Sequence, residues 1–141
     1  KQDMLLIKAA KKKGMKVTCE VAPHHLFFSE NDMPQFENCL KEVRPRLKSE
    51  EDRQALWEMM DLIDMIASDH APHTLEEKQK HQSPGFPGLE TSLPLLITAY
   101  KQGKITLEKI VQMCHTNPKR IFNLPDQPDT YVEVDLDSEW V

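Results

Sequence analysis

The stretch "DMIASDHAPHT" (residues 64–74) joins a short apolar run to an acid, a proline and two histidines. Its apolar run has the length and composition of a buried strand, and Asp69 follows it directly. A second stretch, "KVTCEVAPHH" (residues 16–25), has the same design. There Val17, Cys19 and Val21 alternate with polar residues, which predicts another strand ending before a proline and two histidines. Each strand precedes a helical pattern, and this order favours parallel strands in an α/β protein.

Helix and loop signals fill the rest of the chain. Thr18 and Glu20 are predicted to face away from the core, and Ser49 and Thr106 are predicted to cap helices. The expected helices cover residues 2–13, 50–63, 89–100, 107–114 and a short piece from Pro118; loops are expected over 29–48 and 74–88, and a final strand over 130–136. Two parallel strands cannot close a barrel, so the sequence predicts an unusual fold or a piece of a larger one.

Composition excludes several classes of protein. The chain has 141 residues, 39% hydrophobic and 29% charged, with a net charge of −5. No basic face dominates, which argues against a nucleic-acid partner. No apolar run reaches the length of a membrane span, so no membrane partner is expected. The three widely spaced cysteines fit reduced thiols, which favours a cytoplasmic protein.

The polar residues at the two strand ends are the candidate site. In α/β barrels the chemistry lies at the carboxyl ends of strands, so the two ends are expected to converge. Asp69 suits a metal such as Zn²⁺ and proton transfer, although an aspartate there also suits a turn cap. Either His24 or His25 alternatively packs in the core. Glu20 alternatively faces solvent, because a buried unpaired charge is costly.

Arg44 lies between the two strands in "EVRPRL" (residues 42–47). A loop arginine is usually a solvated surface charge. The planar guanidinium is also the preferred clamp for a carboxylate, through two parallel hydrogen bonds. Arg46, two residues further along the chain, competes for that role.

Five motifs together carry a resemblance to a known family. The motifs, in chain order, are "VTCEVAPHHLFF", "EVRPRL", "SDHAPHT", "PGFPGLET" and "NPKRIFNLP". In this order they resemble dihydroorotases of the amidohydrolase superfamily, over nearly the whole chain. The resemblance implies the C-terminal part of a (β/α)₈ barrel, with strands 7 and 8 and their following helices in residues 1–124. Residues 125–141 would be a linker and the first strand of a small β domain.

The resemblance also implies an activity and roles for residues. The family reaction is the reversible cyclisation of N-carbamoyl-L-aspartate to L-dihydroorotate in pyrimidine biosynthesis, with Zn²⁺ as the cofactor. Asp69 would be the catalytic residue, ligating zinc and moving a proton, and Glu20 and His25 would be further zinc ligands. The substrate-binding residues implied by the resemblance are Arg44, Ala71, His73, Pro87 and Gly88.

Partners and alternatives follow from the same resemblance. It implies an upstream half of the barrel, and in the most similar dihydroorotases also carbamoyl phosphate synthetase and aspartate transcarbamoylase domains. The full-length polypeptide is expected to be a homo-oligomer. The other zinc ligands of the family are absent from these 141 residues, so the piece alone is expected to be inactive. Two alternatives remain open: a cyclic amidohydrolase of the hydantoinase or dihydropyrimidinase type, and a non-catalytic scaffold.

Overall fold

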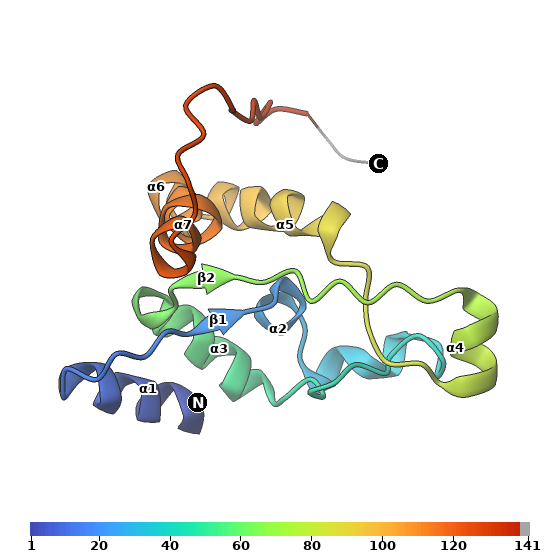
Figure 1. The fold of residues 1–141 in the computed structure, drawn as a ribbon. Helices are drawn as coiled ribbons and strands as arrows, with labels where there is room; N and C mark the ends of the chain where they lie inside the picture. Colours follow the sequence, from blue (N-terminus) through green and yellow to red (C-terminus); the bar gives the residue numbers. More distant parts are fainter. Residues whose placement is uncertain (139–141) are drawn as a thin grey trace.

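A two-stranded parallel sheet lies at the centre of the molecule (Figure 1). The computed structural model describes residues 1–138. In the register of the sheet, Glu20 of strand β1 pairs with Met65 of strand β2, and Val21 pairs with Ile66. The parallel pairing predicted from the two apolar runs is therefore confirmed.

Helices cover both sides of this sheet, with α5, α6 and α7 on one side and α1 and α3 on the other (Figure 1). In chain order the elements are α1 (Gln2–Lys12), β1 (Glu20–Val21), α2 (Pro23–Phe27), the 3₁₀ helix η1 (Glu30–Gln35), α3 (Glu50–Glu58), the 3₁₀ helix η2 (Met60–Leu62), β2 (Met65–Ile66), α4 (Leu75–His81), α5 (Leu89–Lys101), α6 (Leu107–Val111), the π-helical turn η3 (Gln112–Thr116) and α7 (Asn117–Phe122). No helix among residues 1–138 is long and apolar enough to span a membrane.

The core lies between the sheet and the helices. Val21 of β1 is buried, whereas Glu20 is exposed, so the predicted alternation of the first strand is confirmed. The buried cluster consists of Met4, Val21, Leu26, Met60, Ile63, Leu96, Ala99, Ile105, Ile110 and Met113. Most of these residues come from helices on both sides of the sheet, and their burial holds the two strand ends in fixed positions.

A charged cluster ties the N-terminal helix to both strands. The Asp64 carboxylate accepts hydrogen bonds from Lys11 Nζ of α1, at 2.6 Å, and from the Cys19 backbone N–H, at 2.8 Å. Asp64 directly precedes β2 and Cys19 directly precedes β1. The cluster therefore fixes where the two strands begin relative to each other.

Local capping explains where two of the predicted helices begin. The Ser49 hydroxyl accepts from the Asp52 backbone N–H at α3, and the Thr106 hydroxyl accepts from that of Lys109 at α6. Such bonds satisfy amide groups that the first helical turn leaves free. Both predicted caps are confirmed.

Three expectations from the sequence need correction. The expected loop over residues 74–88 contains helix α4, which a capping box between Thr74 and Glu77 starts. The expected loop over 29–48 contains η1, where Ser29 and Asp32 form a second capping box. The strand expected over 130–136 is not formed, because in the described part of the chain this segment has no strand partner to pair with. After α7 this segment bends back over α5 (Figure 1).

Candidate active site

The carboxyl ends of the two strands meet at one edge of the sheet. After β1 the chain turns at once into α2, which Pro23 starts and which carries His24 and His25. After β2 the Ala67 N–H still donates to the Val21 carbonyl, and the chain then reaches Asp69. The distance from His24 Nε2 to Asp69 Oδ2 is 3.7 Å. The predicted convergence of the two strand ends is therefore confirmed for this pair.

Asp69 stands in a left-handed backbone conformation, with φ of 47°. Aspartate is one of the few residues that adopt this region readily, because its short polar side chain suits it. The side chain is half exposed, and its carboxylate accepts no hydrogen bond from residues 1–138. The backbone thus presents a carboxylate that is free to bind a ligand.

The two histidines of α2 each lack a hydrogen-bond partner at one nitrogen. Burial and, to a lesser degree, the neighbouring His25 lower the pKa of His24 to about 4, although the charge of Asp69 opposes the shift. Burial also lowers the pKa of His25. Both His24 Nε2 and His25 Nε2 are buried, and neither forms a hydrogen bond within the described residues. Buried polar atoms without a hydrogen-bond partner are rare in folded proteins. The two Nε2 atoms are therefore available to an electrophile or a hydrogen-bond donor from outside the described residues.

The segment that leads into α5 packs directly on the end of β2. The backbone N–H groups of Gly88 and Leu89 both donate to His70 Nδ1, at 3.1 and 3.2 Å. The Ala71 N–H donates to the Phe86 carbonyl at 3.0 Å. Gly88 lies so close to Ser68 that no larger residue fits there without movement. These contacts hold Gly88 next to the strand end that carries Asp69.

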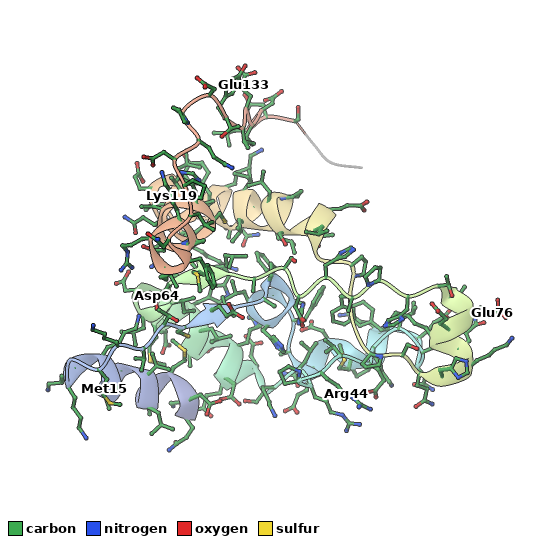
Figure 2. All side chains as sticks on the ribbon, in the orientation of Figure 1. Met15, Arg44, Asp64, Glu76, Lys119 and Glu133 are labelled. Atoms are coloured by element: carbon green, nitrogen blue, oxygen red, sulfur yellow. The ribbon has the colours of Figure 1, made fainter. Side chains whose placement is uncertain are left out.

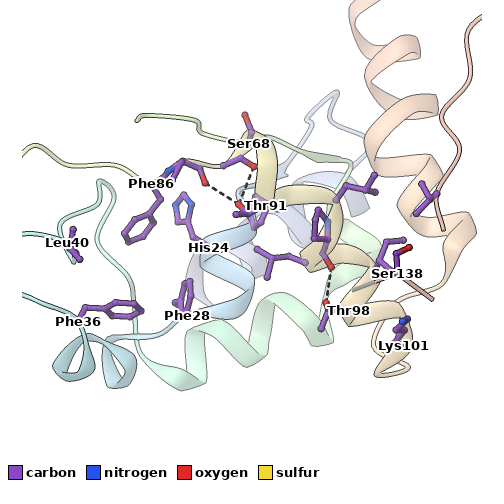
Figure 3. A pocket seen from close by; sticks show the side chains of 18 of the residues that line it. His24, Phe28, Phe36, Leu40, Ser68, Phe86, Thr91, Thr98, Lys101 and Ser138 are labelled. Carbon is purple, nitrogen blue, oxygen red and sulfur yellow. Dashed lines mark hydrogen bonds between the residues drawn. The ribbon is translucent and has the colours of Figure 1, made fainter. Parts of the chain in front are cut away.

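An open, largely apolar cavity of about 910 Å³ adjoins the strand ends (Figure 3). Phe28, Phe36, Leu40 and Phe86 gather on the side of His24, whereas Thr98, Lys101 and Ser138 lie at the other end. Pro87 and Gly88, both predicted to bind substrate, are part of its wall. Asp69, Arg44, Ala71 and His73 are not.

The remaining predicted site residues occupy the surface around this edge. Arg44 is exposed, and it forms no ion pair or hydrogen bond within residues 1–138 (Figure 2). Its competitor Arg46 lies 3.8 Å from Glu42, so Arg44 is the freer of the two guanidinium groups. His73 Nδ1 lies 3.8 Å from the Glu77 carboxylate at the start of α4.

The donor set fits part of a metal site. Aspartate, glutamate and histidine are the ligand types that zinc takes from proteins. Asp69 supplies a free carboxylate beside the buried imidazole of His24. Among the described residues, however, no group of three or more His, Cys, Asp or Glu side chains is placed to hold a metal ion. Glu20, His25 and Asp69 are therefore not gathered into a complete shell by this chain.

Sequence reasoning assigned no role to two residues that the structure places at the site. His24 Nε2 lies 3.7 Å from the Asp69 carboxylate, and His70 accepts two backbone hydrogen bonds from the start of α5. Their place directly after a strand was the only signal available in the sequence. Which of two adjacent histidines faces the aspartate depends on how α2 is oriented, which the sequence does not specify.

Comparison with known proteins gives a consistent result. No family model matches the chain. The chain is 58% identical over 141 residues to the multifunctional protein pyr1-3 of Dictyostelium discoideum, and 46% identical over 127 residues to a dihydroorotase of Pyrococcus furiosus. These matches cover 99% and 86% of the chain. The chain spans only 6% of the first relative and 30% of the second.

Solved structures agree with these relatives. The inactive dihydroorotase-like domain of a CAD-like multifunctional protein from Chaetomium thermophilum matches 99% of the chain with a TM-score of 0.72 and 33% identity, over 41% of its own length. An L-hydantoinase (dihydropyrimidinase) from Arthrobacter aurescens matches 85% of the chain with a TM-score of 0.78 and 32% identity, over 28% of its own length. The resemblance to dihydroorotases and the α/β fold are thus confirmed.

Proposed function

We propose that the chain is the C-terminal part of the barrel of a zinc dihydroorotase, which interconverts N-carbamoyl-L-aspartate and L-dihydroorotate in pyrimidine biosynthesis. The observation that carries the proposal is the 46% identity to a dihydroorotase over 127 residues. The geometry supports it, because a free carboxylate and a buried imidazole meet at the carboxyl ends of two parallel strands, the usual position of barrel active sites.

The proposed roles of the residues are those that the resemblance to dihydroorotases implies. Zinc, when bound, polarises the ring carbonyl and supplies the nucleophile. Asp69 would be a zinc ligand and the proton carrier, a role that its free carboxylate permits. Glu20 and His25 are further ligands that need donors from the rest of the polypeptide.

Substrate recognition falls to the surrounding loops. Arg44 clamps the substrate carboxylate through its unpaired guanidinium. His73 assists it, Ala71 contacts the ring through its backbone, and Pro87 and Gly88 line the pocket.

The proposal extends to the setting of this chain. Residues 1–124 belong to the barrel, and residues 125–141 form a linker and the start of a β domain. The 58% identity to the multifunctional protein pyr1-3 supports a polypeptide with further enzymatic domains, which we propose are carbamoyl phosphate synthetase and aspartate transcarbamoylase. We also propose that the full-length polypeptide is a homo-oligomer and that it is located in the cytoplasm.

A second candidate is an inactive dihydroorotase-like domain. It is favoured by the 33% identity to such a domain over 99% of the chain. The free carboxylate of Asp69 favours activity, because no hydrogen bond from the described residues occupies it and it remains available to a ligand. A hydantoinase-type enzyme is less well supported, since the substrates of such enzymes need no carboxylate clamp like Arg44.

An Asp69→Asn variant of the full-length polypeptide tests the proposal. Asparagine also adopts the left-handed region, so the fold is retained while the anion is lost. We expect hydrolysis of dihydroorotate to fall about 10³-fold, the usual contribution of a positioned acid–base group. The exposed Asp61 provides a control variant, Asp61→Asn, which keeps full activity.

The outcomes of this experiment separate the candidates. Full activity in Asp69→Asn would remove the proton-carrier role. A wild-type polypeptide that leaves dihydroorotate intact and yet folds would support the inactive domain instead. Turnover of hydantoin in preference to dihydroorotate would support the hydantoinase type.

A further inference from the structure

Lys78 of α4 is a buried lysine, with 5% of its surface exposed. Two residues further along the same helix, the Lys80 side chain is 65% exposed and pairs with Glu76. A lysine ammonium is almost never buried without partners, because removing its charge from water is costly. The burial of Lys78 therefore implies that its ammonium has a task within the fold.

Backbone carbonyl groups satisfy this ammonium. Lys78 Nζ donates to the Gly85 carbonyl at 2.8 Å and to the Ser83 carbonyl at 3.2 Å. It also lies 5.9 Å from the centroid of the Phe86 ring, within the range of a cation–π contact. Within residues 1–138 no carboxylate oxygen lies within 4.0 Å of it. The charge thus links α4 to the segment over residues 83–86, and to no acidic group.

That segment is the connection between three parts of the candidate site. The Gly85 N–H donates to the Glu42 carbonyl at 2.9 Å, two residues before Arg44. The Phe86 carbonyl accepts from the Ala71 N–H. The Phe86 ring lies edge-on to the His24 ring, with 5.3 Å between the ring centroids; the two rings are labelled in Figure 3. Pro87 and Gly88 follow directly.

The position of α4 makes this link important. The helix stands at one end of the molecule, away from the sheet (Figure 1). Gly85 has φ of 132°, and its Cα approaches Ala71 so closely that a Cβ would lie 2.4 Å from the Ala71 Cβ. This close approach requires the segment over residues 83–86 to keep its position. The Lys78 ammonium binds the carbonyl of the same glycine and so fixes that position.

We propose that Lys78 is a positioning residue whose buried ammonium, bound to the carbonyls of residues 83 and 85, holds the substrate-binding loops around Arg44, Ala71 and Gly88 in place. The inference rests on the proposed dihydroorotase function. Lys78 also lines the cavity beside the strand ends, and its proposed role there is to hold backbone carbonyls in place. The residue acts through Gly85, which it joins to the loops on either side.

A Lys78→Met variant of the full-length polypeptide tests the inference, with Lys80→Met as the matched control. Methionine keeps most of the length of the side chain and removes the charge and the donors. We expect KM for dihydroorotate to rise about tenfold, from the loss of hydrogen bonds made by a charged donor, while kcat changes little. Lys78→Arg, which keeps a cationic donor, is expected to recover most of the loss, and Lys80→Met to match wild type.

Amide hydrogen exchange over residues 83–89 provides a readout that does not depend on activity. Faster exchange there in Lys78→Met but not in Lys80→Met supports the anchor. Unchanged KM in a folded Lys78→Met variant overturns the inference, as does unchanged exchange. If Lys78→Met fails to fold, Lys78→Gln, which keeps a neutral donor group, decides between the same outcomes.

The two proposals fail in different ways. If the wild-type polypeptide does not hydrolyse dihydroorotate, the proposed function fails and the effect on substrate binding fails with it. Exchange over residues 83–89 then still decides whether the Lys78 ammonium orders the loop.

Discussion

Replacing Gly88 by alanine tests how closely the end of β2 and the start of α5 must approach. A Cβ built at Gly88 would lie 2.1 Å from the Ser68 carbonyl oxygen and 3.0 Å from its carbon. Because carbon and oxygen atoms rarely approach below about 3 Å, the two segments must separate by about 1 Å. Ser68 directly precedes Asp69, so the carboxylate moves with it.

The magnitude of the effect follows from this displacement. Overpacking of this kind costs about 1 to 3 kcal/mol of stability. A misplacement of about 1 Å at a reacting group costs about 100-fold in rate. We therefore expect Gly88→Ala in the full-length polypeptide to lower kcat for dihydroorotate about 100-fold while destabilising the fold only moderately.

Gly103→Ala is the matched control. A Cβ at Gly103 would have no neighbouring atom within 4 Å, but the φ of 69° at this position strains any larger residue. The expected cost is about 1 to 2 kcal/mol, close to that of Gly88→Ala, with kcat unchanged. The assay is steady-state kinetics together with thermal unfolding of both variants. If kcat of Gly88→Ala stays within about threefold of wild type, the argument from displacement is wrong.

Two further predictions concern acid stability and the isolated chain. Hydrogen bonds from Arg53 and then Gln54 lower the pKa of the Glu50 carboxyl to about 2 in the folded protein. The stability that Glu50 contributes is therefore fully present at a pH above the ordinary pKa of a glutamate, and it is lost as the pH falls toward 2. Glu50→Gln is therefore expected to be less stable than wild type in urea unfolding at about pH 6, with a smaller difference at about pH 3; a constant difference would contradict this. The 141-residue chain alone is expected to bind zinc weakly in calorimetric titration and to leave dihydroorotate intact, since its donors are not gathered into a shell; measurable turnover would refute it.

The sequence predicted what depends on local pattern. The alternation around Val21 and the apolar run before Asp69 defined two buried strands, and the helical patterns after them implied parallel pairing. Ser49 and Thr106 were recognisable as caps because a cap needs only a residue three positions on. Thr74 and Glu77 have the same spacing, so α4 was also visible in principle; the Gly and Pro residues that follow it led to the expectation of a loop.

What the sequence could not predict depends on contacts between distant segments. The strand expected over residues 130–136 needs a partner, which the described chain does not provide. The roles of His70 and Lys78 arise because residues further along the chain bring backbone groups to their nitrogens. Neither a histidine nor a lysine in a polar stretch reveals this from its neighbours in sequence.

The separation of the paired strands has a consequence for synthesis of the protein. Cys19, just before β1, and Asp64, just before β2, are joined by a hydrogen bond although 45 residues separate them. At ribosomal rates of about 5 to 20 residues per second, β1 emerges about 2 to 9 s before its partner strand exists. Throughout that interval the amide groups of the nascent strand bind water in place of β2, and the apolar side chain of Val21 is exposed. The first strand is therefore where we expect a chaperone to engage the growing chain, and where slow codons between the strands would lengthen the exposure.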